Sequence, residues 1–279
     1  MQKSLIIPAA LLVLIVALLP TMAVVNYSFQ TPYGEPNEFV GFDNYRKILH
    51  DSRWWDAFKR NLIFSIIVIL IEIPLGLGLA LLLYKKGKIN GVISTVIVLP
   101  VLLPWVTVGL MWRLMCRSAG PITTFFNFFN FDYNIFLSST HAFWTIVLMD
   151  VWHWTSIVFI VLLAGLVGMR RAPILAAKTE GASRWRIFRY IQLPALKFPL
   201  IFLILIRFMD SFKIYDEVNI LTAGGPGLST EFLTMYVKRL ALDQWILGPG
   251  AAASLFYLFT VLVVCISLML VLTKGEGLI

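Results

Sequence analysis

Charged residues are scarce in this chain of 279 residues, because Asp, Glu, Lys and Arg together make up only 14% of it. An ordinary soluble domain carries about 25% charged residues. Hydrophobic residues make up 59% of the chain, and the mean hydropathy is +0.84. This shortage of charge excludes an ordinary soluble domain and favours a polytopic membrane protein.

Residues that build disulfides and metal sites are also few. The chain has two cysteines, Cys116 and Cys265, which lie far apart and form no C-x-x-C pair. This spacing indicates neither a disulfide framework nor a cysteine metal site. His153 lies among tryptophans with no second ligand at metal spacing, so we expect it to make a structural hydrogen bond.

Long apolar runs, by contrast, are abundant. A helix needs about 20 predominantly apolar residues to cross a bilayer. The runs predict an all-α fold with six transmembrane helices in a single transmembrane domain, residues 1–279. The first run is too long for a signal peptide and no A-x-A-like site follows it, so we expect a retained helix. The predicted spans are residues 5–25, 62–84, 92–115, 142–167, 198–215 and 251–272.

Two prolines interrupt the third apolar run. Pro100 and Pro104 lie one helical turn apart. Each proline removes a backbone donor and clashes with the preceding turn of a helix. We therefore expect this span to be broken or bent.

The net charge of +8 is concentrated in short loops between the apolar runs. Such a distribution sets membrane orientation and does not indicate nucleic-acid binding. Lys3, the cluster at Lys85 to Lys88, the loop 170–197 and Lys274 would share one side of the membrane. The positive-inside rule places that side, with both termini, in the cytoplasm.

Several ionisable residues fall within or next to the apolar runs. Such residues are costly in a bilayer, face the interior of the helix bundle and find partners there. We expect Arg207 to pair with Asp210, and Lys213 to pair with Asp216 or Glu217, along one helix. For Glu72, a structural hydrogen bond and a role in a translocation pathway both remain open. The predicted pathway residues are Glu72, Asp150, Arg207, Asp210, Lys213 and Asp216.

The stretch from Leu175 to Pro194 is polar and basic, and lies between two apolar runs. The sequence LAAKTEGASRWRIFRYIQLP predicts two helices joined by a turn at Gly181. Glycine reaches a positive φ without strain, and Pro194 is expected to end the second helix. Its cations, Lys178, Arg184, Arg186 and Arg189, outnumber the single acid, Glu180.

This stretch resembles the EAA loop of ABC-transporter permease subunits. Ala176-Ala177, Gly181-Ala182, Phe188 and Leu193-Pro194 match that pattern, whereas its leading Glu is Leu175 here. In the family, the loop docks a short cytoplasmic helix onto a separate ATP-hydrolysing subunit. The resemblance implies coupling to an ATPase through Ala176, Ala177, Glu180, Gly181, Ala182, Arg184 and Arg186, within the cytoplasmic loop 170–197.

A second resemblance lies near the end of the fifth run. SFKIYDE at residues 211–217 and LTAGGP at residues 221–226 are similar to the signature of sugar-uptake ABC permeases. The GGP turn resembles the maltose-F-like and sn-glycerol-3-phosphate-A-like members. The resemblance implies a type I ABC importer permease fold, with the chain in a bacterial cytoplasmic membrane.

The partners follow from the same resemblance. It implies a second permease subunit, two ATP-binding subunits, an extracytoplasmic solute-binding protein and a carbohydrate substrate, with membrane lipid around the helices and no nucleic acid. The chain has no G-x-x-x-x-G-K-[ST] loop, so ATP and Mg would be used by the partner ATPase and no cofactor is expected on this chain. It would be a transport subunit and not an enzyme.

Other functions compete with this interpretation. An ion-coupled secondary transporter or channel would use Glu72, Asp150 and Asp210 as proton or cation sites, with no ATPase. A membrane-embedded enzyme would need paired carboxylates or a metal cluster at the membrane surface, and the sequence shows none. The stretch 175–194 could also be a helical hairpin that only covers the ends of the bundle.

Overall fold

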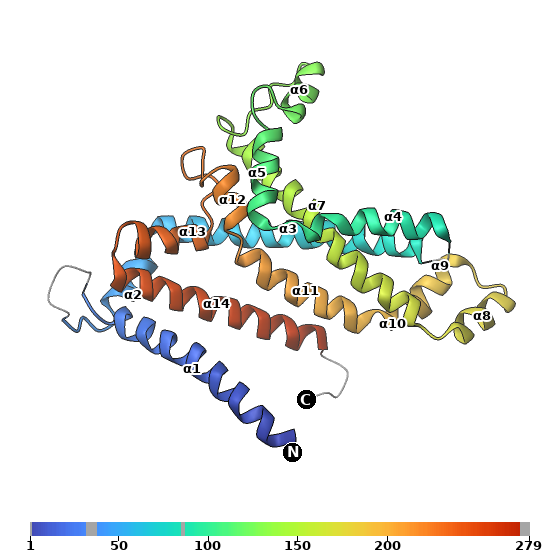
Figure 1. The fold of residues 1–279 in the computed structure, drawn as a ribbon, viewed down its shortest axis with the longest axis horizontal. Coiled ribbons are helices and arrows are strands. Elements are labelled where there is room, and N and C mark those ends of the chain that lie inside the picture. The colour runs from blue at the N-terminus through green and yellow to red at the C-terminus, as the bar shows by residue number, and fades with distance from the viewer. Residues whose placement is uncertain (1, 32–37, 85–86, 274–279) are drawn as a thin grey trace. The chain divides into compact units, whose positions relative to one another are not determined.

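The computed structural model describes residues 2–31, 38–84 and 87–273. Figure 1 shows that these residues are almost entirely helical, and their one β-bridge joins Gln30 and Phe39. Lys85, Lys86 and Lys274, on which part of the predicted charge asymmetry rests, lie outside the described residues. The described chain thus has the all-α architecture that the apolar runs predict.

The chain divides into two compact units. Unit 1 comprises residues 1–59 and 232–264, and unit 2 comprises residues 60–231 and 265–279. The long helices α3 (Ser52–Leu83) and α14 (Leu247–Thr273) each contribute to both units. The other helices of unit 1 are α1 (Gln2–Ser28), α2 (Asp43–His50), α13 (Leu233–Lys238) and the π-helix η3 (Arg239–Asp243).

In unit 1, side chains of α2 and α3 bind the segments around them. Asn44 donates hydrogen bonds to the carbonyls of Ser28 and Gln30, at 3.0 and 2.8 Å, which ties α2 to the end of α1. Trp54 is completely buried. Its ring packs against Tyr236 of α13.

Unit 2 carries most of the short helices. α7 is its central element, since 61% of its apolar stretch is buried. The helices of unit 2 besides α3 and the end of α14 are α4 (Lys88–Val98), the 3₁₀ turn η1 (Leu99–Leu102), α5 (Trp105–Met115), α6 (Pro121–Phe128), α7 (Ser139–Gly168), α8 (Arg171–Thr179), α9 (Arg184–Ile187), the π-helix η2 (Phe188–Gln192), α10 (Leu193–Ala195), α11 (Lys197–Phe212) and α12 (Asp216–Leu221).

Four helices are long and apolar enough to cross a membrane, namely α1, α3, α7 and α14. Two bent pairs pass the same criterion of length and composition, so the described residues hold up to six spans if each pair counts as one. These four helices and two pairs fall on the six predicted apolar runs. Two of the helices begin well before their runs, α3 at Ser52 and α7 at Ser139.

The third run is broken where the prolines predict it. α4 ends at Val98, a 3₁₀ turn containing Pro100 follows, and α5 begins directly after Pro104 with its axis turned by 98°. Leu103 and Pro104 have extended backbones, with ψ of 134° and 144°. The prolines account for this break because neither can donate to the helix ladder.

The break after the basic stretch lies two residues beyond the predicted one. Pro194 sits in the first turn of α10, where a proline needs no N–H partner, so it does not end the helix. The chain bends by 64° between the helical segment Arg184–Ala195 and α11. Leu196, at this bend, is completely buried. It belongs to an apolar core to which α7 contributes Val158, Phe159 and Leu162.

The fifth span ends earlier than predicted. α11 stops at Phe212 and a new helix, α12, begins at Asp216, so Asp216 and Glu217 do not lie on one helix with Arg207 and Asp210. Asn61 of α3 explains the stop. Its amide donates to the carbonyls of Ser211 and Phe212, at 3.4 and 3.2 Å, and so pairs acceptors that a helix end leaves free.

Candidate functional site

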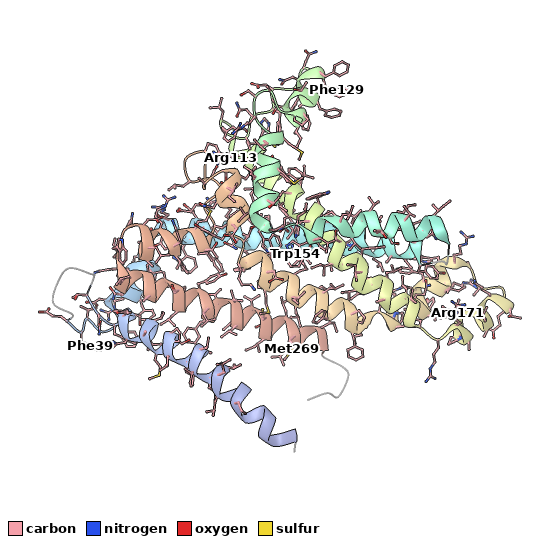
Figure 2. The ribbon with its side chains drawn as sticks, in the orientation of Figure 1. Phe39, Arg113, Phe129, Trp154, Arg171 and Met269 are labelled. Carbon is pink, nitrogen blue, oxygen red and sulfur yellow. The ribbon has the colours of Figure 1, made fainter. Side chains whose placement is uncertain are left out.

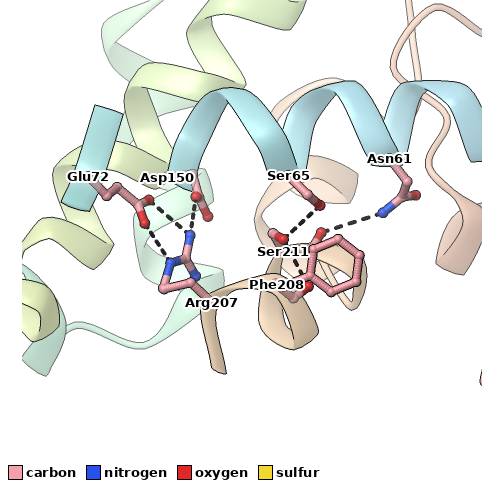
Figure 3. Close-up of polar contacts among 7 residues, drawn as sticks. All are labelled: Asn61, Ser65, Glu72, Asp150, Arg207, Phe208 and Ser211. Atoms are coloured by element: carbon pink, nitrogen blue, oxygen red, sulfur yellow. Dashed lines mark hydrogen bonds and ion pairs between the residues drawn. The ribbon is translucent and has the colours of Figure 1, made fainter. Parts of the chain in front are cut away.

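A buried cluster of three charged side chains joins three helices of unit 2. Arg207 of α11 donates from Nε to Oε2 of Glu72 at 2.6 Å and from Nη2 to Oε1 at 2.9 Å. Its Nη2 also donates to Oδ2 of Asp150 at 2.6 Å. Figure 3 shows the guanidinium of α11 lying between the carboxylates of α3 and α7. All three side chains are buried, and such charge-assisted, bidentate contacts are the strong ones.

The predicted ion pairs along α11 are wrong. Arg207 binds Glu72 and Asp150, whereas Asp210 is taken by Lys213, with 2.9 Å between Oδ1 and Nζ. A completely buried guanidinium needs several acceptors, and one carboxylate a turn away on the same helix supplies too few. Lys213 cannot pair one turn onward with Asp216 or Glu217, because the helix has already ended. The expected partner for Glu72 is present as Arg207.

A group of aromatic rings packs beside this cluster. The guanidinium carbon of Arg207 lies 4.2 Å from the ring centre of Trp154, which is a cation–π contact. Trp154 lies 5.2 Å from Trp105, and His153 lies 4.3 Å from Trp105, both measured between ring centres. The Nδ1 atom of His153 has no hydrogen-bond partner among the described residues. The predicted structural hydrogen bond of His153 is therefore wrong at this atom, and aromatic packing holds the ring.

Further polar contacts join α3 to α11. Ser65 and Ser211 share a hydrogen bond of 2.7 Å, and Asn61 caps α11 as described above (Figure 3). The sequence carries a signal for this set in the spacing of its polar residues. Asn61, Ser65 and Glu72 lie in an apolar run at offsets of four and eleven residues, which places them on one face of a helix.

A cavity of about 170 Å³ opens next to the charged cluster. Four of the six predicted pathway residues line it, while Glu72 and Arg207 lie outside its wall and reach it through Asp150. Trp105, Trp154, Tyr215 and Glu217 also line the cavity, although the sequence pattern did not predict them as pathway residues. The wall is formed by Trp105, Asp150, Trp154, Asp210, Lys213, Ile214, Tyr215, Asp216 and Glu217.

The cavity depends on the close approach of α5 and α12. Gly109 of α5 faces the backbone of Glu217, and a Cβ atom added at Gly109 would lie 2.8 Å from the Glu217 carbonyl oxygen. Glu217 is a buried residue of α12. This short helix is not one of those that are long and apolar enough to span a membrane. Burial is the main cause that raises the pKa of Glu217 to about 7.

The basic stretch lies at another end of unit 2. Figure 1 shows α8 and α9 away from α5 and α12, and Figure 2 shows Trp154 inside the unit and Arg171 on α8. Gly181 joins α8 to the next turn with a φ of +77°, as predicted, and Ser183 caps α9 by accepting from the backbone N–H of Arg186. Among the predicted coupling residues, Ala177 and Ala182 are half-buried, whereas the exposed ones are Ala176, Glu180, Gly181, Arg184 and Arg186.

Long apolar helices around a buried ion cluster define a polytopic membrane protein whose charges are held inside the bundle. The chain belongs to the family described as the binding-protein-dependent transport system inner membrane component, which matches residues 72–274. This family comprises transport components, not enzymes, and its matched region contains both the ion cluster and the basic stretch.

Individual relatives agree with this membership. The chain is 29% identical to the trehalose/maltose transport system permease protein MalF of Thermococcus litoralis, over 93% of this chain and 88% of the relative. It is also 29% identical to the sulfoquinovosyl glycerol transport system permease protein SmoG of Agrobacterium fabrum, over 97% and 90%. A crystal structure of a bacterial ABC transporter that imports the acidic polysaccharide alginate contains a chain of the same fold, with a TM-score of 0.88, 19% identity and coverage of 99% and 96%.

Proposed function

We propose that this chain is a membrane-spanning permease subunit of an ATP-driven, binding-protein-dependent ABC importer for a sugar or related carbohydrate. The observation that carries the proposal is the family match over residues 72–274, which encloses the ion cluster, the cavity and the basic stretch. The names of similar permeases, for trehalose and maltose and for sulfoquinovosyl glycerol, support a carbohydrate as the cargo.

The cavity beside the ion cluster is the proposed part of the translocation pathway. Trp105 and Trp154 offer ring faces for a sugar, and Asp210, Lys213 and Asp216 offer polar groups. Its volume of about 170 Å³ is below the roughly 300 Å³ at which ligand pockets begin. This shortfall supports a site completed by a second permease subunit. Glu72, Asp150 and Arg207 would hold the wall of the pathway in place.

The exposed stretch from Ala176 to Arg186 is the proposed contact with the ATPase. Two ATP-binding subunits would use ATP and Mg, and their closure would move this stretch and the helices attached to it. The same proposal places the loop 170–197 and both termini in the cytoplasm, in a bacterial cytoplasmic membrane, with six spans in one permease domain. An extracytoplasmic solute-binding protein would deliver the carbohydrate on the opposite side.

The alternative of an ion-coupled transporter has less support. Its proposed cation sites were Glu72, Asp150 and Asp210. The first two are bonded to Arg207, and Asp210 is bonded to Lys213. Carboxylates already paired with protein cations are poor sites for a transported cation.

Affinity purification of the tagged chain in mild detergent tests the proposal. We expect a second permease and an ATP-binding protein to be recovered with it, in a ratio of one to one to two. Recovery of the chain alone, or as a homo-oligomer without an ATPase under gentle extraction, would contradict the importer assignment.

A further inference from the structure

We propose that the cavity lined by Trp105, Trp154 and the acidic residues of α11 and α12 accepts neutral or cationic carbohydrates and rejects anionic ones. The inference rests on the proposed function, because it specifies the charge of the cargo at the same site. Family membership leaves that charge open, since the similar permeases are named for neutral and for anionic carbohydrates.

The cavity and the groups bonded to its wall are acidic. Its wall holds four carboxylates and one cation, Lys213. Behind the wall, Asp150 is bonded to Arg207, which in turn binds Glu72. The set therefore has five carboxylates and two cations, which gives a formal charge of −3, or −2 when Glu217 is protonated. The four carboxylates of the wall are Asp150, Asp210, Asp216 and Glu217.

Both cations already have carboxylate partners. The Nε and Nη2 atoms of Arg207 are bonded to Glu72 and Asp150. Its Nη1 atom has no hydrogen-bond partner among the described residues, but the side chain is completely buried and does not line the cavity. Lys213 is paired with Asp210 at 2.9 Å. A phosphate or carboxylate in the cavity would thus have to compete with these bonds for a cation.

Two of the acids, by contrast, have no cationic partner in the described part of the chain. Neither Asp216 nor Glu217 makes an ion pair among the residues that the structure describes. Asp216 is exposed at the cavity, and Glu217 is buried in its wall. Charges on a low-dielectric wall act on a ligand more strongly than charges in water.

The chemistry of a neutral sugar fits this wall. Its hydroxyl groups donate hydrogen bonds to carboxylates, and its ring faces pack on aromatic side chains such as Trp105 and Trp154. An ammonium group of an amino sugar would be attracted as well. A glycerol phosphate or a uronate would place like charges side by side, which is an effective way to reject a ligand.

The electric field in the cavity is measurable without knowledge of the cargo. In the assembled transporter in membrane vesicles, with Cys116 and Cys265 replaced by Ser, Trp105→Cys places a single thiol in the wall. Its rate of modification is measured with a cationic trimethylammonium-ethyl, an anionic sulfonatoethyl and a neutral methyl methanethiosulfonate reagent. The ratio of cationic to anionic rates is divided by the same ratio for a small free thiol.

We expect this normalised ratio to be at least about tenfold. Adding Asp216→Asn and Glu217→Gln should bring it several-fold closer to one, while the rate with the neutral reagent stays the same. Tyr215→Cys provides a second reporter in the wall if Trp105→Cys fails to assemble. A normalised ratio of one or below, or a cavity thiol that even the neutral reagent does not reach, would overturn the inference.

The outcomes separate this inference from the proposed function. A transporter that assembles with its ATPase but gives a normalised ratio of one retains the importer assignment and loses the charge selectivity. A chain that recruits no ATPase but gives a high ratio loses the importer assignment and keeps an acidic, water-accessible cavity.

Discussion

Arg207 is bound by carboxylates from two other helices. Replacing Arg207 alone should therefore change stability more than replacing all three charged residues of the cluster. Arg207→Met leaves Glu72 and Asp150 buried without a cation, and we expect it to destabilise the protein by about 3–5 kcal/mol. Replacing all three groups, with Glu72→Gln and Asp150→Asn added, should recover most of this loss. Thermal unfolding in one detergent measures both effects.

Lys213→Met is the matched control for Arg207→Met, because it removes the cation of a partly exposed ion pair. Its effect should stay within about 1 kcal/mol. Equal destabilisation by Arg207→Met and Lys213→Met would contradict the importance of burial at the cluster.

Glu217 predicts a pH dependence of stability. Its pKa is about 7 in the folded chain, against an ordinary value of 4.5. The folded state thus binds a proton more tightly than the unfolded state between these two values, and stability falls as the pH rises. The stabilisation is complete below about pH 4.5 and lost as the pH passes 7. Glu217→Gln should flatten this fall, by at most about 3 kcal/mol, in unfolding curves recorded across that range. An unchanged pH profile in the variant would show that Glu217 does not titrate in this way.

For single residues, the sequence predicted that Glu72 needs a buried partner, but it did not predict which residue supplies that partner. The cost of an unpaired charge in a membrane is a local property, so it can be argued from one apolar run. The identity of the partner depends on which helices are neighbours, and Arg207 lies 135 residues further along the chain. The rule of pairing along one helix favoured Asp210 and therefore failed.

Among the elements, α5 and α12 are packed so closely that a methyl group should separate them. Gly109→Ala would place its Cβ 2.8 Å from the backbone oxygen of Glu217. We expect a loss of about 1–3 kcal/mol, since backbone cannot yield as a flexible side chain does. Gly91→Ala in α4 is the control, because its Cβ would meet no neighbouring atom of the described residues within 4 Å. Alanine favours a helix over glycine, so this control should be neutral or stabilising in thermal unfolding.

Equal destabilisation by Gly109→Ala and Gly91→Ala would contradict the close approach of α5 and α12. If only Gly109→Ala loses stability, the cause is contact with the neighbouring backbone and not a change in helix propensity.

The breaks in the helices show which elements can be read from the sequence. The bend between α4 and α5 was predictable, because Pro100 and Pro104 act on their own chain segment. The end of α11 at Phe212 was not, because Asn61 of another helix caps it. The prediction that Pro194 ends a helix was wrong because a proline is tolerated in the first turn of a helix.

For the whole transporter, Gly181→Val separates coupling from folding. Gly181 has a φ of +77°, and an added Cβ would meet no atom of the described chain within 4 Å. Gly227, in the turn after α12, has a φ of +61° and equally open surroundings. Valine at either position carries a similar backbone strain. If the stretch 176–186 contacts the ATPase, only Gly181→Val should abolish uptake and reduce co-purification of the ATPase, at a normal level of the chain in the membrane.

Uptake at the original rate in Gly181→Val would remove the coupling proposal. Equal losses in Gly181→Val and Gly227→Val would show that strain in the chain itself, and not a lost contact, is responsible.

At the level of the whole chain, composition was sufficient for the class of protein and for the number of apolar runs. The resemblances at residues 175–194 and 211–226 predicted the family that the match over residues 72–274 now shows. The cavity was not predictable, because its wall combines residues of α5, α7, α11 and α12 whose proximity is set by tertiary packing.

The ion cluster also restricts how unit 2 can move. Pulling α3, α7 or α11 away from the other two would strand a charge in apolar surroundings, at a cost of about 3–5 kcal/mol. Bending at the breaks around Leu103, Leu196 and Lys213 separates none of these three charges, because no member of the cluster lies at a break. We therefore expect the three clustered helices to move together in a transport cycle, with bending at these breaks.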